Sequence, residues 1–305
     1  MNYFKKIFLT LISLILLFSI SVYSRGTINP YRTRPQSNSA PEQKTIVSAG
    51  YVWSNLNFST KAYDTGSIIT WRDIRLHGAQ VNIDFAEAPF GDKTSIGLNY
   101  SVSSQGYSTD DDANNYFNSI DAASAKASSF GLAYEVMSES EKIWLAPKLG
   151  IDFNCLKLKA YDSKLFTSGP NYFQEGLVAK YDIYKLGLYG GIQAKLIESG
   201  PVQLNVSGQV GVGAYLALAD WIHRSDLKHP VSFYDMGLTF RTGGEVEVLF
   251  DLDKFFIFGK MQAAYEVSPG IGLHNQRFSN GDRGCQRMFF ELSQIAFQVG
   301  AKADF

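Results

Sequence analysis

From about residue 45 onward, hydrophobic and polar residues alternate with a period of two. Every second residue from Ile295 to Phe305 is apolar, and Gln298, Lys302 and Asp304 are among the residues between them. Successive side chains of a β-strand point to opposite faces, so such a segment has one apolar face. The same pattern predicts an all-β chain, with strands that include 79–85, 96–102, 184–196, 202–218, 246–250 and 255–267.

The connections between these strands alternate between short and long. Short turns are expected near 88–92, 138–142, 198–201 and 251–253. Longer polar segments are expected near 62–66, 108–125, 162–175, 222–232 and 268–286. Outer-membrane barrels have short periplasmic turns and long external loops. The pattern therefore predicts about ten antiparallel strands in up-and-down order, with both ends on the periplasmic side.

Two architectures accommodate alternating strands: a water-soluble sandwich with its apolar faces inside, and a membrane barrel with its apolar faces against lipid. Many of the predicted strands exceed the roughly 5–6 residues usual in soluble sheets. The last strand ends in Phe305, as is common in outer-membrane barrels. Closure also leaves no unpaired strand edge in lipid. We therefore predict a transmembrane β-barrel over residues 45–305.

The amino terminus has the order of a secretory signal peptide. Lys5 and Lys6 precede an apolar run over 7–22, and small residues around Ser24 suit cleavage. A membrane anchor is the alternative, but the run is shorter than the roughly 20 residues that span a bilayer. We predict a signal peptide over 1–24, a disordered polar segment over 25–44, and a bacterial outer-membrane location. The 28 basic and 29 acidic residues nearly cancel, so composition suggests no nucleic-acid partner.

Two predicted external loops carry candidate chemistry. Asp110, Asp111 and Asp112 form an acidic cluster, which could also be a solvated loop or a weak cation site. The stretch 220–230 holds two of the four histidines, and an Asp beside a His can make it a base for water. A polar loop with an unpaired His is the simpler reading. In a barrel of about ten strands the two loops face each other across the mouth, so together they predict a water-activating hydrolytic site.

Other candidate chemistry is sparse. The sequence has no nucleophile elbow, no phosphate loop and no Cys or His spacing typical of a metal site. Lys157, Lys159 and Lys164 form a modest basic group near a rim. We interpret these lysines as solvated, with contact to lipid phosphates as the alternative.

Several motifs resemble the omptins, outer-membrane proteases built as ten-stranded barrels. The strand from Ser95 that leads to Asp110–Asp112 resembles the omptin strand ending in an Asp-x-Asp pair. Asp-Trp-Ile at 220–222, then Asp226 and His229, then Leu-Thr-Phe-Arg at 238–241 are similar to a second omptin series. The family has Asp-x-His where this chain has Asp-x-x-His.

The resemblance implies an aspartic-type endopeptidase that cleaves polypeptides near basic residues without a covalent intermediate. Asp226 and His229 would activate water, Asp110 and Asp112 would form the opposed pair, and Asp64 would bind the basic substrate side chain. The active face would be extracellular, with no metal and no cofactor apart from a lipopolysaccharide requirement. We expect a monomer that contacts outer-membrane lipid and lipopolysaccharide.

Two other functions stay open. The altered Asp-x-x-His spacing motivates a non-catalytic barrel, either an adhesin or an inactive omptin fold. A small porin is the third reading, although inward polar side chains would mostly fill the lumen of a ten-stranded barrel.

Overall fold

The computed structural model describes residues 45–64, 66–88, 91–111, 120–138, 145–165, 172–252 and 254–305. The predicted signal peptide (1–24) and polar segment (25–44) lie outside these ranges. The strands are β1 (Thr45–Ala62), β2 (Ile68–Ala88), β3 (Gly91–Ser103), β4 (Tyr107–Asp111), β5 (Ile120–Met137), β6 (Leu145–Leu165), β7 (Tyr172–Ser199), β8 (Val202–Trp221), β9 (Phe233–Asp251), β10 (Phe256–Arg277) and β11 (Arg283–Asp304). No helix in the described ranges is long and apolar enough to cross a membrane.

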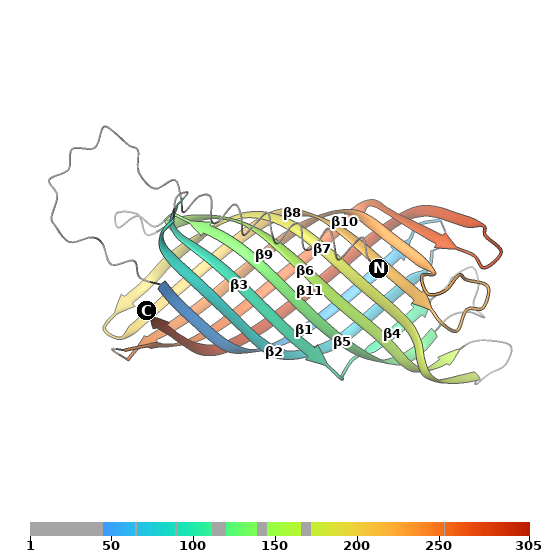
Figure 1. Cartoon of the computed structure of the whole chain (residues 1–305), viewed down its shortest axis with the longest axis horizontal. Coiled ribbons are helices and arrows are strands. Elements are labelled where there is room, and N and C mark those ends of the chain that lie inside the picture. The colour runs from blue at the N-terminus through green and yellow to red at the C-terminus, as the bar shows by residue number, and fades with distance from the viewer. Residues whose placement is uncertain are drawn as a thin grey trace.

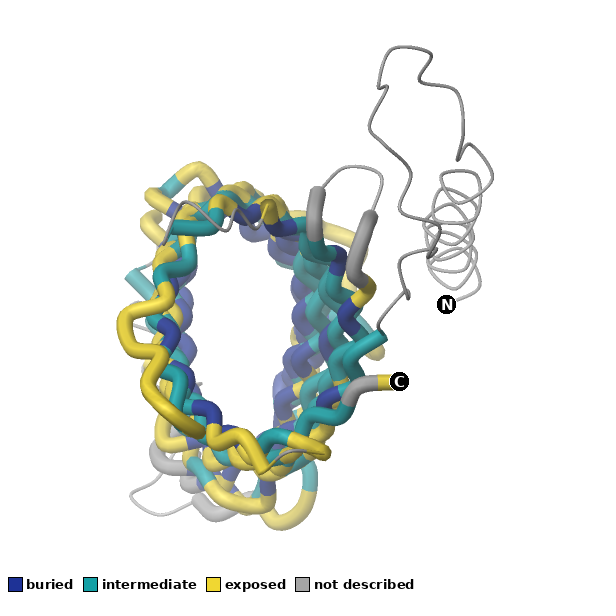
Figure 2. Tube along the Cα trace, turned by 90° about the vertical axis from the view of Figure 1, so that its left-hand side faces the viewer, coloured by how far each residue is buried: buried dark blue, intermediate teal, exposed yellow. Residues whose placement is uncertain are grey.

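The sheet closes on itself. All pairings are antiparallel, β5 to β11 each pair with the next strand in chain order, and β1 pairs with both β11 and β2. Figure 1 shows the tilted strands in sequence around the wall, and Figure 2 shows the ring seen along its axis. Closure satisfies the backbone hydrogen bonds of both terminal strands, which an open sheet would leave unpaired. The predicted antiparallel up-and-down architecture is confirmed.

The strand number also agrees with the prediction once β3 and β4 are taken together. Both pair with β2 on one side and β5 on the other, so in the 11-stranded sheet they occupy a single place in the wall. The short break between them leaves ten positions around the barrel. After the break, β4 resumes the pairing in the wall. Asp110 therefore lies in a strand, where the sequence predicted a loop.

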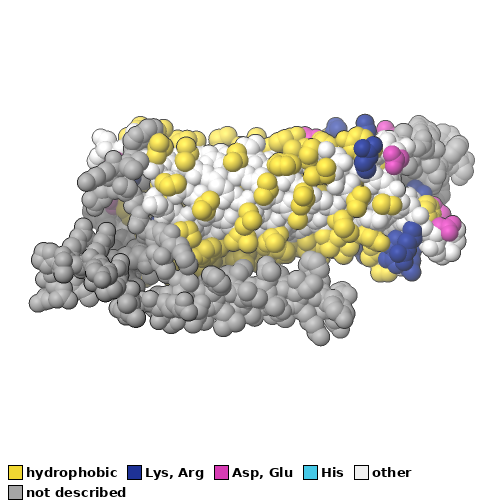
Figure 3. All heavy atoms as spheres, turned by 90° about the horizontal axis from the view of Figure 1, so that it is seen from above, with side chains coloured by type: hydrophobic (Ala, Val, Ile, Leu, Met, Phe, Trp, Pro, Cys, Tyr) yellow, Lys and Arg dark blue, Asp and Glu magenta, His cyan; other side chains and the backbone are white. Residues whose placement is uncertain are grey.

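The outer wall is apolar. Exposed large hydrophobic side chains stand at outward positions of successive strands: Tyr51, Leu98, Tyr100, Leu149, Leu188, Val210, Val212, Leu238, Phe240, Ile295, Phe297 and Val299. They gather along the length of the barrel, with charged side chains toward one end (Figure 3). Exposed apolar area on this scale is unfavourable in water. The strands are 13–28 residues long apart from β4, more than the roughly 9–11 that cross a bilayer, so they extend beyond the lipid.

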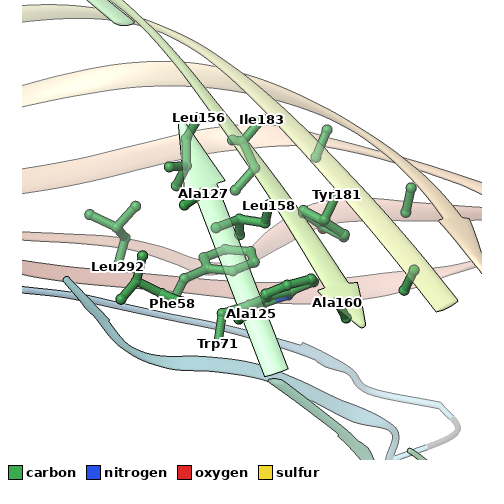
Figure 4. Packing of buried hydrophobic residues seen from close by; sticks show 14 of the residues in the cluster. Phe58, Trp71, Ala125, Ala127, Leu156, Leu158, Ala160, Tyr181, Ile183 and Leu292 are labelled. Atoms are coloured by element: carbon green, nitrogen blue, oxygen red, sulfur yellow. The ribbon is translucent and has the colours of Figure 1, made fainter. Parts of the chain in front are cut away.

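An aromatic cluster crosses the lumen toward the end that carries the long loops. The ring of Phe58 on β1 lies 5.3 Å from that of Tyr181 on β7, and Tyr215 on β8 stacks on Phe290 on β11 at 4.5 Å. These strands are not neighbours in the sheet, so the contacts span the interior. Figure 4 shows Phe58, Trp71 and Tyr181 packed with aliphatic side chains between the strands. The cluster separates the mouth from the rest of the lumen.

The other half of the lumen is polar. A cavity of about 530 Å³ is lined mainly by Ser, Asn, Gln and charged side chains. Ion pairs bridge non-adjacent strands, as between Lys185 on β7 and Glu266 on β10. Arg241 on β9 pairs in the same way with Asp152 on β6. The packed aromatic cluster and the ion pairs that cross the lumen are a poor fit to a porin channel.

The connections agree with the predicted alternation in part. At one end they are 63–67, 112–119, 166–171, 222–232 and 278–282, and at the other 89–90, 138–144, 200–201 and 252–255. The prediction of a long loop over 268–286 was wrong. Strand pairing continues through it on both sides of a register shift between Ser268 and Gly272. Ser-Pro-Gly at 268–270 forms an irregularity inside a strand.

Candidate active site

Asp110 lies inside the barrel near the long-loop end. It stands on β4 and is 7% exposed. Its Oδ2 accepts a hydrogen bond of 2.5 Å from Nε1 of Trp221, which comes from β8 across the lumen. Asp111, the next residue, is exposed, as the strand period requires. Asp112 lies outside the described residues, so its role stays a prediction.

The predicted pair of Asp226 and His229 does not form. Asp226 instead accepts two hydrogen bonds from Arg224, from Nε at 2.8 Å and from Nη2 at 2.7 Å. This guanidinium lowers the pKa of Asp226 below its usual range. The Nδ1 of His229 lies 2.6 Å from Oδ1 of Asp220, and its Nε2 lies 3.2 Å from the carbonyl oxygen of Arg224. Both ring nitrogens are therefore occupied, which leaves neither for a water molecule.

The pair of Asp220 and His229 also faces away from Asp110. Ala219 and Trp221 are both buried in the aromatic cluster, so they point inward. Asp220 stands between them on the same strand and therefore points to the outer side of the wall. The predicted opposition of Asp226 and His229 to Asp110 is therefore not seen, because Asp226 is held by Arg224 and His229 by the outward-pointing Asp220.

A second Asp–His pair lies inside the barrel. Asp235 on β9 and His274 on β10 are register partners, and Oδ1 of Asp235 lies 2.6 Å from Nδ1 of His274. The hydroxyl of Tyr181 donates to the other carboxylate oxygen. Asp235 is 2% exposed and His274 7% exposed. Among the described residues, none hydrogen-bonds Nε2 of His274.

This inner pair is arranged to act as a base. A carboxylate on Nδ1 holds the imidazole in one tautomer, so that Nε2 carries the lone pair that can take a proton from water. Asp110 is linked to this pair through packed side chains, because its partner Trp221 meets the ring of Phe233, which lies against His274. The ring of Phe233 lies 4.9 Å from the imidazole and limits its movement. The arrangement is an oriented base with a carboxylate nearby.

The remaining predicted residue, Asp64, is exposed in the connection 63–67 at the same end of the barrel. Its proposed role in binding a basic side chain stays a prediction. The described residues include no group of three or more His, Cys, Asp or Glu side chains able to hold a metal ion.

Sequence reasoning missed Asp235, His274 and Tyr181. His274 fell within the long polar segment predicted over 268–286, and Asp235 was passed over although it stands three residues before Leu238, where the Leu-Thr-Phe-Arg series begins. The sequence held one signal for Asp235. Residues 239, 241 and 243 of the same strand point inward, and because side chains alternate between the two faces, Asp235 points inward as well. No sequence spacing relates residues 181, 235 and 274, which come together only through strand register.

Comparisons with known proteins identify the fold. No family model matches the chain, and no curated protein matches it. Among solved structures, the outer membrane protease OmpT of Escherichia coli aligns with a TM-score of 0.61 and 13% identity over 87% of this chain and 98% of that chain. The translocator domain of the autotransporter NalP from Neisseria meningitidis gives a TM-score of 0.39 and 15% identity, over 88% and 90%. OprG from Pseudomonas aeruginosa gives 0.37 and 10%, over 86% and 96%.

The first of these likenesses supports the fold of an outer-membrane β-barrel. At 13% identity it does not show membership of the omptins. The last two have TM-scores below 0.5, so they carry no argument about this chain.

Proposed function

We propose that this chain is an outer-membrane endopeptidase whose water-activating couple is Asp235 and His274, with Asp110 beside it. The observation that carries the proposal is the inner pair itself, in which His274 is oriented by Asp235 while its Nε2 has no hydrogen-bond partner among the described residues. The aromatic cluster supports it further, because a sealed lumen suits a rim enzyme better than a pore.

The proposed reaction needs no covalent intermediate. Water bound at Nε2 of His274 attacks the peptide carbonyl, and its proton passes to the imidazole. Asp235 and Asp110 stabilise the imidazolium that results. The imidazolium then gives the proton to the leaving amine, and the carbon–nitrogen bond breaks. Two carboxylates near one imidazole suit this transient positive charge.

The preference for basic residues is also proposed. Asp64 and Asp111 are exposed at the same end as the inner pair and supply negative charge there. Under this proposal the long-loop end faces the outside of the cell, as the external loops of outer-membrane barrels do. Peptides with Lys or Arg are then the substrates expected.

We further propose that lipopolysaccharide binds the outer wall. Lys126, Lys159 and Lys180 are lateral register partners on β5, β6 and β7, all on the outward face. A row of ammonium groups from three neighbouring strands suits the phosphates of an anionic lipid. The sequence analysis grouped Lys159 with Lys157 and Lys164, because lysines on neighbouring strands are brought together only by strand register.

The proposed function is tested with the full mature chain, refolded with lipopolysaccharide and given a dibasic fluorogenic peptide. We expect His274→Gln to lower turnover by about 100-fold or more, since general-base catalysis contributes that much. His77→Gln is the matched control, because His77 lies on the outer wall and bonds Tyr51. Equal turnover in wild type and His274→Gln would overturn the proposed couple.

The proposed lipid site is tested separately, by measuring the binding of lipopolysaccharide. Lys159→Glu is expected to weaken binding of lipopolysaccharide to the refolded barrel. Lys195→Glu serves as the control, since Lys195 is exposed near the opposite end of the barrel. Equal binding by both variants would count against the lysine row.

A non-catalytic barrel is the second candidate, and the burial of the inner pair favours it. With Asp235 2% and His274 7% exposed, a polypeptide does not reach the couple in this conformation. An adhesin would bind host cells equally well after Asp235→Asn and His274→Gln. Such binding, in a chain without peptide turnover, would support this candidate over the first.

A further inference from the structure

The loop between β8 and β9, residues 222–232, folds over the rim next to the inner pair. Leu227, in the middle of the loop, is 1% exposed and belongs to the aromatic cluster. Leu227 and Phe278 form an isolated antiparallel bridge, and Phe278 packs against the same cluster. A loop at a barrel rim would ordinarily be solvated on all sides. This loop instead places one apolar side chain inside the barrel.

Polar contacts hold the loop at several points. Asp226 pairs with Arg224 within the loop, and His229 pairs with Asp220 at the end of β8. Backbone hydrogen bonds of 2.9 Å join Lys228 N to Arg277 O and Ser279 N to the carbonyl of Asp226. The loop is therefore fastened to the β10–β11 connection as well as to its own strands.

The two ends of the loop flank the proposed catalytic groups. Trp221, directly before the loop, donates to Asp110. Phe233, directly after it, packs against His274, and the rings of Trp221 and Phe233 meet edge to face at 5.3 Å. Any displacement of residues 222–232 would shift Trp221 and Phe233, and with them the cover over Asp110 and His274.

We infer that residues 222–232 form a lid that closes the proposed active site, with Leu227 as its anchor. Its backbone hydrogen bonds to Arg277 and Ser279 and the Asp220–His229 pair hold it in place, and the Arg224–Asp226 pair braces it internally. This inference rests on the proposed function and states how that site is regulated. It assigns Asp226 and His229 to holding the lid rather than to activating water.

The lid is tested first by access to the lumen, which needs no catalysis. Ala219 is inward-facing and 1% exposed beside Trp221, so Ala219→Cys in a chain lacking Cys155 and Cys285 reports on entry. Adding Leu227→Ala is expected to speed its reaction with a maleimide by about tenfold or more, because a buried anchor is lost. Leu252→Ala, at an exposed site on the opposite end, is the control. An unchanged rate with Leu227→Ala would overturn the lid.

The second test locks the lid. Bridge partners lie within reach of a disulfide, so Leu227→Cys with Phe278→Cys, again without the native cysteines, should cross-link on oxidation. We expect peptide turnover to fall at least tenfold in the oxidised form and to recover on reduction. Equal turnover in both forms would also overturn the lid. Absence of turnover in every form, together with faster labelling by Leu227→Ala, would reject the peptidase and retain the lid.

Discussion

Replacing Glu266 with glutamine tests whether the lumen behaves as a packed, low-dielectric interior. Glu266 is 8% exposed and accepts hydrogen bonds from Nζ of Lys185 at 2.5 Å and from Oγ1 of Thr239 at 2.7 Å. Glutamine has nearly the same shape but no charge. The substitution therefore leaves the Lys185 ammonium, whose side chain is 14% exposed, without its paired carboxylate.

The expected cost follows from this burial. Removing one partner of a buried ion pair typically destabilises a protein by about 3–5 kcal/mol, since the other charge stays desolvated. Glutamine can still accept from Thr239, so we expect about 3 kcal/mol. The exposed pair Lys195–Glu198, with side chains 48% and 66% exposed, provides the matched control. Glu198→Gln is expected to cost no more than about 1 kcal/mol.

The measurement is the free energy of unfolding of the refolded barrel in urea, followed by tryptophan fluorescence. The double variant Lys185→Met with Glu266→Leu removes both charges and is expected to recover most of the loss. If Glu266→Gln costs as little as Glu198→Gln, the lumen is effectively aqueous. The sealed, ion-paired interior described above would then be refuted.

Three further predictions follow from other parts of the barrel. Gly78→Ala is expected to impair refolding, because a Cβ there would lie 1.9 Å from a backbone oxygen of β3, whereas Gly208→Ala meets nothing within 4 Å; refolding yield compares them. Phe58→Ala is expected to open the lumen and give measurable conductance in planar bilayers, unlike Phe297→Ala on the outer wall. The lowered pKa of Asp226 means that its contribution to loop closure is present above its unfolded pKa of about 4 and is lost as the pH falls from there through the lower folded pKa. Acrylamide quenching of tryptophan should therefore rise with acid more in wild type than in Asp226→Asn, which retains the carboxylates of Asp110 and Asp220.

The strand scaffold could be predicted closely from the sequence, whereas the site could not. Alternation of apolar and polar residues is a local signal, and it placed strands such as 202–218 and 255–267 correctly. The same signal failed near Ser268, because a bulge and a loop share the same turn-forming residues. The sequence analysis singled out Asp110 as a candidate. The motif that suggested Asp226 and His229 as partners, however, did not show toward which side of the wall their side chains would point.

By itself, the sequence determined that the chain is a barrel with an apolar outside, because a period of two fixes which side chains share a face. Only the tertiary structure decided which inward side chains meet across the lumen. That depends on closure and register, which bring Tyr181, Asp235 and His274 together from three strands and turn Asp220 outward. Moving a strand by one residue would exchange its two faces. The identity of the candidate base is therefore a property of strand pairing, which no local pattern along the chain encodes.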